Sequence, residues 1–288
     1  MYDAAAIPPN TRTKGVFASM IHPTAIIDSS ARIDPTVSIG PYCVITGPVQ
    51  LGPDCVLDSH VHLIGPMNLG ARNHVHSFAV LGDTPQDRKH KDDPSRLIIG
   101  NDNIFREHVT VHRGTNGDTV IGSGCFFMAG SHVAHNCRVA DNVTLINQAV
   151  LGGHVLVEEK AIIGGNCAVH QFCRIGKLTM ISNNSAHNTD IPPYVISMNI
   201  NTFTQLNLVG LRRSGMGADT INAIRRMFRV IFRERSSLPL ARAFDQLPAD
   251  LAAIPEIQYF INFCRESKRG VAKYHAWSLR HSSGAAEH

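Results

Sequence analysis

Four histidines and one glutamine recur between residues 132 and 171 at intervals close to 18. The positions of His135 and His154 differ by 19, and those of His135 and Gln171 differ by 36. His170 directly precedes Gln171, and His132 comes shortly before His135. Imidazole can act as a general acid or base near neutral pH, and neutral imidazole is also the commonest metal ligand. A structural ladder on stacked turns is a third interpretation, and the spacing alone does not separate the three.

The spacing of the aliphatic residues explains this interval. A large apolar residue occupies every sixth position from 21 to 81, from 99 to 111 and, after a shift of four, from 121 to 181. This period fits neither an α-helix nor a simple alternating strand, and the many glycines and prolines would break helices. Three hexapeptides, which together make an interval of 18, would close one triangular coil. We therefore predict an all-β solenoid, a parallel β-helix with the aliphatic residues in a continuous core.

Cysteine and glycine positions follow the same register. Glycine often comes directly after the aliphatic residue, and we expect it to supply unusual backbone angles at a sharp corner. No C-x-x-C motif occurs, which disfavours a metal site or a disulfide framework. We interpret as buried packing residues the six cysteines that fall at the fourth position after an aliphatic one, namely Cys43, Cys55, Cys125, Cys137, Cys167 and Cys173.

Two interruptions of the repeat predict loops. The polar segment 83–96 (DTPQDRKHKDDPSR) cannot supply core residues, and the segment 116–119 (NGDT) accounts for the shift of four. Binding residues tend to lie on loops that leave a rigid solenoid. The first loop is the better candidate.

The pattern changes beyond the segment 190–193 (DIPP), and helical spacing begins at about residue 204. We predict a flexible N-terminal extension (1–20), a hexapeptide-repeat β-helix (21–197) with the loop 83–96, a small C-terminal α-helical domain (198–275) and a flexible tail (276–288). The helical domain is rich in arginine, which is either a solvated helix face or a docking surface for an acidic protein.

Composition sets broad limits on the function. The chain has 43% hydrophobic and 17% charged residues, as expected of a globular protein, and its net charge of +4 permits an acidic partner without requiring one. There is no apolar run long enough to span a membrane and no signal-peptide pattern. We expect a cytoplasmic protein without a transmembrane segment and without a nucleic-acid partner.

Several sequence blocks together resemble one enzyme family. The blocks SHVAHNC at 131–137, LGGHV at 151–155, AIIGGNCAVHQFC at 161–173 and DIPPYV at 190–195 resemble the UDP-N-acetylglucosamine 3-O-acyltransferases, which catalyse the first committed step of lipid A synthesis. The motif HRGT at 112–115, Gln86-Asp87 in the loop and GLRR at 210–213 belong to the same resemblance, which spans about residues 21–270.

The resemblance implies a fold, an assembly and a reaction. The β-helix would be left-handed, and the protein would be a homotrimer with active sites in clefts between neighbouring chains. It would be a cytoplasmic enzyme of a Gram-negative-type bacterium. An acyl group would arrive as a thioester on acyl carrier protein. His135 would be the general base that deprotonates the 3-hydroxyl of UDP-N-acetylglucosamine, and the Gly153 N–H would stabilise the oxyanion. No cofactor, metal or covalent intermediate is implied.

Further residues take expected roles from the same resemblance. Asn183 would lie at the acyl-chain ruler. The arginines expected to dock the acidic carrier protein are Arg212, Arg225 and Arg226. The residues expected to bind the sugar nucleotide or line its cleft are Asp87, Lys89, His132, His154, His170, Gln171, Asn207 and Arg213.

Departures from the family pattern concern the base and the substrates. Asn136 stands where the family has an acidic residue, so a partner that would orient or charge-balance His135 is missing. Asn183 favours a shorter or more polar acyl chain. Segment 198–205 is one residue shorter than usual, and Val209 and Ser214 replace an acidic and a basic residue. The alternatives are a paralogous acyltransferase with another nucleotide-sugar or amine acceptor, a metal-dependent hydratase, and a catalytically silent scaffold.

Overall fold

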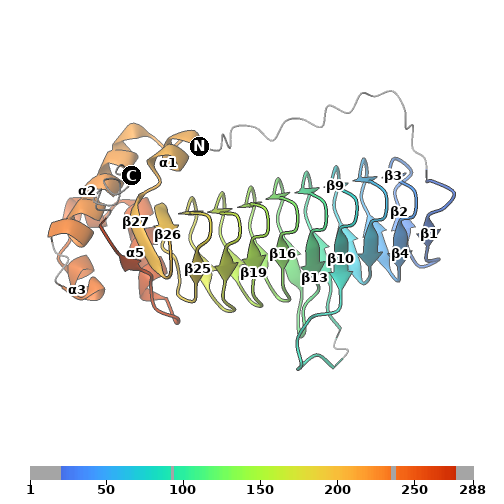
Figure 1. The fold of residues 1–288 in the computed structure, drawn as a ribbon. Coiled ribbons are helices and arrows are strands. Elements are labelled where there is room, and N and C mark those ends of the chain that lie inside the picture. Colours follow the sequence, from blue (N-terminus) through green and yellow to red (C-terminus); the bar gives the residue numbers. More distant parts are fainter. Residues whose placement is uncertain (1–20, 92–93, 235–237, 277–288) are drawn as a thin grey trace, which may run out of the picture.

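The computed structural model describes residues 21–91, 94–234 and 238–276. The predicted N-terminal extension 1–20 and, apart from residue 276, the predicted tail 276–288 lie outside the described residues. Figure 1 shows a rod of stacked coils that begins near β1 and ends against a group of helices. The predicted left-handed parallel β-helix with a small helical domain is confirmed.

Short strands build the walls of the rod, and within the described residues they form three sheets. In spatial order, the first sheet contains β1 (Ile26–Ile27), β4 (Val44–Thr46), β7 (His62–Ile64), β10 (Val80–Asp83), β13 (Thr110–His112), β16 (His132–Val133), β19 (Val150–Leu151), β22 (Ala168–Val169) and β25 (Ala186–His187). The second contains β2 (Arg32–Ile33), β5 (Val49–Leu51), β8 (Met67–Leu69), β11 (Leu97–Ile99), β14 (Thr119–Ile121), β17 (Arg138–Val139), β20 (Leu156–Val157) and β23 (Arg174–Ile175). The coil part of the third contains β3 (Ser38–Ile39), β6 (Val56–Leu57), β9 (His74–Val75), β12 (Ile104–Phe105), β15 (Phe126–Phe127), β18 (Thr144–Leu145), β21 (Ile162–Ile163) and β24 (Met180–Ile181).

The strand register confirms the predicted coil length. Leu151 pairs in parallel with Val169, and their positions differ by 18. The positions of the paired Leu81 and Val111 differ by 30, so the first loop adds 12 to one coil. Those of Ile99 and Ile121 differ by 22, so the second interruption adds four. Figure 1 shows the first loop leaving the rod beside β10 and β13.

The core lies inside the coils, where the aliphatic repeat predicted it. Leu63, Val111 and Ile163 are fully buried, and the rings of Phe105 and Phe127 stack 4.8 Å apart on successive coils. Burying such a side chain contributes about 1.5–3 kcal/mol. The six repeat cysteines are buried free thiols, as predicted, and burial raises the pKa of Cys137 to about 12.

The prediction that the corner glycines supply unusual backbone angles holds at Gly82, with φ of 91°, but is wrong at the other glycines that directly follow an aliphatic repeat position. Gly40 and Gly52 do not have positive φ; the left-handed residues come two positions later, at Tyr42 and Asp54, with φ of 59° and 57°. A Cβ on Gly52 would instead lie 2.8 Å from the carbonyl carbon of Gly70 on the next coil. Glycine is therefore needed because stacked backbones approach closely at this point, not because of its angles.

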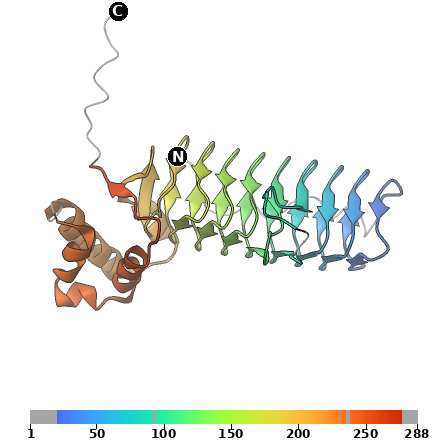
Figure 2. The same ribbon diagram turned by 90° about the horizontal axis from the view of Figure 1, so that it is seen from below.

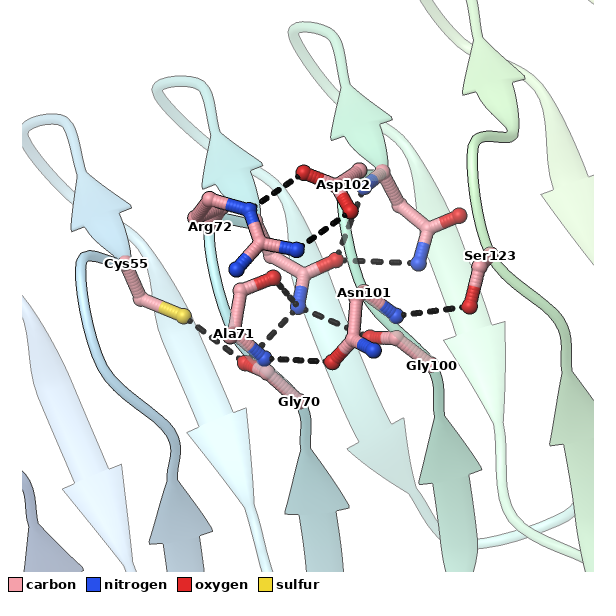
Figure 3. Close-up of polar contacts among 10 residues, drawn as sticks. Cys55, Gly70, Ala71, Arg72, Gly100, Asn101, Asp102 and Ser123 are labelled. Carbon is pink, nitrogen blue, oxygen red and sulfur yellow. Dashed lines mark hydrogen bonds and ion pairs between the residues drawn. The ribbon is translucent and has the colours of Figure 1, made fainter.

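Side chains reinforce the corner of Gly52 on the following coils (Figure 3). Arg72 makes two hydrogen bonds of 2.7 Å to the Asp102 carboxylate on the next coil. The Asn101 carboxamide oxygen accepts a hydrogen bond from the Ala71 N–H, and the Asn101 N–H donates to the Ser123 hydroxyl. The two Asn101 contacts satisfy backbone N–H groups that lie outside the short strands.

The third sheet continues beyond the coils. β26 (Val195–Met198) pairs in parallel with β24, β27 (Thr202–Leu206) pairs antiparallel with β26, and β28 (Lys273–Tyr274) pairs with β27. The domain boundary predicted at residue 197 therefore falls inside β26, and the coils and the helical part share one sheet.

The helices cover the C-terminal end of the rod (Figures 1 and 2). They pack on β27 through aromatic rings, with the Phe203 ring 5.1 Å from that of Phe232 and 6.2 Å from that of Phe228. No helix of the described residues is long and apolar enough to cross a membrane. The helical elements are α1 (Leu208–Arg213), α2 (Ala218–Arg229), the π-helical turn η1 (Val230–Glu234), α3 (Leu240–Asp245), α4 (Ala249–Ala252) and α5 (Pro255–Arg265).

Candidate active site

His135 lies at the corner that follows β16. The pairing of Val133 with Leu151 and of Leu151 with Val169 places His135, Gly153 and Gln171 at equivalent positions of three successive coils. His135 is 9% exposed. The predicted coil length thus brings together the residues that the sequence selected.

Asn136 orients the His135 imidazole. Its side-chain oxygen lies 2.9 Å from His135 Nδ1 and also accepts a hydrogen bond of 2.9 Å from the Thr115 N–H. Its amide nitrogen donates to the carbonyl oxygens of Asn116 and Gly117. The Thr115 N–H requires an acceptor, so the atom of the Asn136 amide that faces it is assigned as oxygen. Because this oxygen also faces His135 Nδ1, Nδ1 carries the proton and His135 Nε2 keeps its lone pair. The prediction that His135 lacks an orienting partner is therefore wrong, although the partner is neutral.

Gly153 lets the imidazole lie directly against the backbone of the next coil. A Cβ at this position would lie 2.6 Å from both Cε1 and Nε2 of His135. The Gly153 backbone is outside the left-handed region, so space and not conformation requires glycine here. No hydrogen bond within the described part of the chain uses the Gly153 N–H. The nitrogen that can accept a proton thus lies beside a glycine N–H.

Other histidines surround His135 and are held neutral. The rings of His135 and His154 are perpendicular, 5.4 Å apart, and His132 Nδ1 is 2.7 Å from the Thr110 hydroxyl. Burial, together with the nearby His112 and His135, lowers the pKa of His132 to about 4. Burial also lowers the pKa of His154. Neutral neighbours do not oppose the positive charge that His135 gains when it takes a proton.

The first loop closes over the same corner. Asp87 accepts hydrogen bonds from the Lys89 N–H and the Thr115 hydroxyl, both at 3.0 Å. The Lys89 N–H bond is the main reason that the pKa of Asp87 is lowered, and the charge of His135 lowers it further. The loop therefore brings a carboxylate near the imidazole, through Thr115.

Other predicted residues lie farther from this centre or have structural partners. His170 and Gln171 are exposed, and Asn183 is exposed with its side-chain oxygen accepting from the Gly165 N–H. Asn207 is buried, where it caps α1 and donates to the Leu178 carbonyl, so its substrate contact stays a prediction.

The arginines predicted to dock a partner lie on α1 and α2. Arg212, Arg225 and Arg226 are exposed. Arg213, which is predicted to line the sugar-nucleotide cleft, is exposed as well. Arg226 forms an ion pair of 2.8 Å with Asp250, so its charge is partly compensated.

Sequence reasoning missed two contributors. Thr115 connects Asn136 to Asp87, and its place directly after the glycine of the HRGT motif was the available signal. Phe172 stacks on His154 with the ring centroids 4.6 Å apart. It follows His154 by one coil length, and that interval could have revealed the contact.

Comparison with known proteins gives a consistent result. Residues 190–272 match the family model for the second domain of UDP-N-acetylglucosamine O-acyltransferase, and residues 118–153 match the bacterial transferase hexapeptide repeat. An acyl-[acyl-carrier-protein]–UDP-N-acetylglucosamine O-acyltransferase of Anaeromyxobacter dehalogenans is 40% identical over 257 residues, which cover 88% of this chain and 99% of that protein.

Solved structures agree in fold as well as in sequence. The UDP-N-acetylglucosamine acyltransferase of Francisella novicida superposes with a TM-score of 0.82 at 32% identity, covering 88% of this chain and 94% of that one. The corresponding Moraxella catarrhalis enzyme gives 0.82 at 38% identity, covering 87% and 98%. With its coils, its helical end and nearly its full length matched, this chain belongs to the UDP-N-acetylglucosamine O-acyltransferase family of acyltransferases.

Proposed function

We propose that this chain transfers an acyl group from acyl carrier protein to the 3-hydroxyl of UDP-N-acetylglucosamine, the first step of lipid A synthesis. One observation carries the proposal. The His135 imidazole donates from Nδ1 to Asn136, and its Nε2 lies beside Gly153. A base with a fixed tautomer next to a backbone N–H meets the geometric requirements for acyl transfer.

His135 acts as the general base in this proposal. Its Nε2 takes the proton of the sugar hydroxyl while the hydroxyl oxygen attacks the thioester carbonyl. The Gly153 N–H donates to the oxygen that becomes negative. When the tetrahedral intermediate collapses, the carbon–sulfur bond breaks and the imidazolium returns its proton to the leaving thiolate. The products are an ester and the free thiol of the carrier, and no covalent intermediate forms on the protein.

The proposal also covers the substrate contacts and the assembly, and membership of the family supports it. Asp87 and Lys89 bind the sugar nucleotide from the loop, with His132, His154, His170, Gln171, Asn207 and Arg213 lining its cleft. The cleft lies between chains of a homotrimer. Asn183 limits the acyl chain, and its exposed polar side chain favours a short or hydroxylated acyl group.

The test combines product analysis with a single substitution. The purified protein is incubated with acyl carrier protein thioesters of several lengths and UDP-N-acetylglucosamine, and the product is identified by mass spectrometry. We expect a 3-O-acyl product and a loss of about 10²–10⁴-fold in kcat for His135→Asn. Turnover of a different sugar nucleotide, without 3-O-acyl product at any chain length, refutes the proposal and favours a paralogous acceptor.

A further inference from the structure

A second group of histidines lies on a different sheet from His135. His74 on β9 and His76 directly after it both project outward, separated by the inward-facing Val75, and Asp58 follows β6 on the preceding coil. The pairing of Leu57 with Val75 sets Asp58 beside His76. β9 lies two coils before β15, the strand that precedes β16, so this group is roughly 10 Å from His135 along the rod.

Three ligand atoms converge in this group. Asp58 Oδ1 is 3.2 Å from His74 Nε2, and Asp58 Oδ2 is 3.2 Å from His76 Nδ1. All three ligand atoms lie within 4.8 Å of one another. Neighbouring ligands of a tetrahedral zinc ion with bonds of about 2.0–2.1 Å are about 3.3–3.4 Å apart. Each imidazole nitrogen therefore lies about one such edge from a different oxygen of the Asp58 carboxylate, so an ion held by both imidazoles would bind one or both of these oxygens.

The surroundings suit a bound ion. The side chains of Asp58, His74 and His76 are only 13%, 8% and 17% exposed. A hollow of about 320 Å³ lies beside the group, and Asp58 is one of the residues that line it. Glu107 lies at the outer edge, with its carboxylate 3.7 Å from His76 Nδ1. The group is thus largely shielded from solvent, and Glu107 offers a second carboxylate for a fourth position.

We propose that Asp58, His74 and His76 bind one divalent transition-metal ion that clamps two successive coils. Two imidazoles and a carboxylate form a ligand set typical of Zn²⁺, and Ca²⁺ or Mg²⁺ would require more oxygen ligands. The ion joins the coil of β6 to the coil of β9, so its role is to stabilise the rod. It takes no part in acyl transfer.

Metal titration of the full-length chain tests the proposal. After removal of metals with a chelator, the protein is titrated with Zn²⁺ by calorimetry and with Co²⁺ by visible absorption. We expect one ion per chain, the intense absorption of four-coordinate Co²⁺ and a higher melting temperature with Zn²⁺. Absence of stoichiometric uptake of either ion overturns the proposal without the need for any variant.

Substitutions locate the ion. We expect Asp58→Asn and His76→Gln to weaken Zn²⁺ binding by more than the roughly 10–100-fold that loss of an outer-shell partner costs. His62→Gln, on the same coil as His76 but in the first sheet, is the matched control and should bind normally. His76 is the less buried of the two histidines, so His76→Gln decides if Asp58→Asn does not fold. Unchanged binding in His76→Gln, or loss of binding in His135→Asn, contradicts the assignment.

Discussion

Replacing Gly153 by alanine should separate catalysis from folding. A Cβ at this position would lie 2.6 Å from Cε1 and Nε2 of His135, whereas ordinary contacts begin near 3.4 Å, so the ring must retreat by about 0.8 Å. The obstacle is a side chain, and the Gly153 backbone angles are open to alanine. The fold can therefore accommodate the methyl group by moving the imidazole.

The substitution should lower the rate of acyl transfer. Moving the ring stretches its 2.9 Å contact with Asn136 and takes Nε2 away from the position that a hydroxyl must meet. A misplacement of about 1 Å costs on the order of 100-fold in rate, or about 2.7 kcal/mol of transition-state stabilisation. We expect Gly153→Ala to lower kcat by about that factor.

The assay compares three proteins. Steady-state kcat and melting temperature are measured for the wild type, for Gly153→Ala and for Gly217→Ala. Gly217→Ala is the control, because a Cβ at residue 217 meets nothing within 4 Å. We expect both variants to melt within a few degrees of the wild type and only Gly153→Ala to lose activity. A Gly153→Ala enzyme with kcat within twofold of the wild type would refute the argument that the imidazole must lie against this backbone.

The described contacts support three further predictions. Asn136→Asp places a carboxylate beside His135 Nδ1, where it favours the imidazolium, and should therefore move the acid limb of the pH–rate profile to higher pH. Loss of the amide donors should also destabilise the protein by about 1–3 kcal/mol. An unchanged profile contradicts this prediction. His132 has a pKa of about 4 in the folded protein against 6.5 normally, so between these values only the unfolded chain takes up its proton. The free energy of unfolding should therefore fall as the pH falls through this window, by up to about 1.4 kcal/mol per unit. Urea titrations at pH 7 and 5 should show a weaker pH dependence in His132→Gln, and equal dependence would count against the assignment. Finally, Arg225→Ala should raise the KM for acyl carrier protein several-fold and weaken the salt dependence of this KM. Arg226→Ala should have smaller effects, because Arg226 already forms an ion pair with Asp250. Equal effects of the two substitutions would argue against docking through arginine charge.

The fold could be predicted because its signal is repeated on every coil. The apolar period specified the coil length, the core and both interruptions, and the same count brought His135 and Gly153 together. The role of the corner glycines could not be predicted, because it depends on how closely adjacent backbones stack. Residues as different as Tyr42 and Asp54 adopt the left-handed angles instead. The types of the residues at these corners therefore did not indicate which positions have left-handed angles and which have closely stacked backbones.

The orientation of the base was hidden for another reason. Asn136 stands where the family has an acidic residue, and a comparison of motifs alone therefore suggests that His135 has lost the partner that orients it. Its hydrogen bonds to residues 115–117 depend on the short insertion that folds back onto the corner. A side chain's partners across such an insertion follow from the path of the backbone, which the spacing of residues does not specify.

The antiparallel strand β27 gives the rod two unlike ends. A parallel solenoid leaves unpaired strand edges at both ends, and complementary edges allow one rod to add to the next without limit. Here the polarity reverses between β26 and β27, and the helices follow, so the C-terminal end offers no continuation of the coil. At the other end of the described residues, Ile26 on β1 is 67% exposed. Growth of a filament needs complementary edges at both ends, so within the described residues β27 and the helices disfavour end-to-end growth at the C-terminal end as well as covering it.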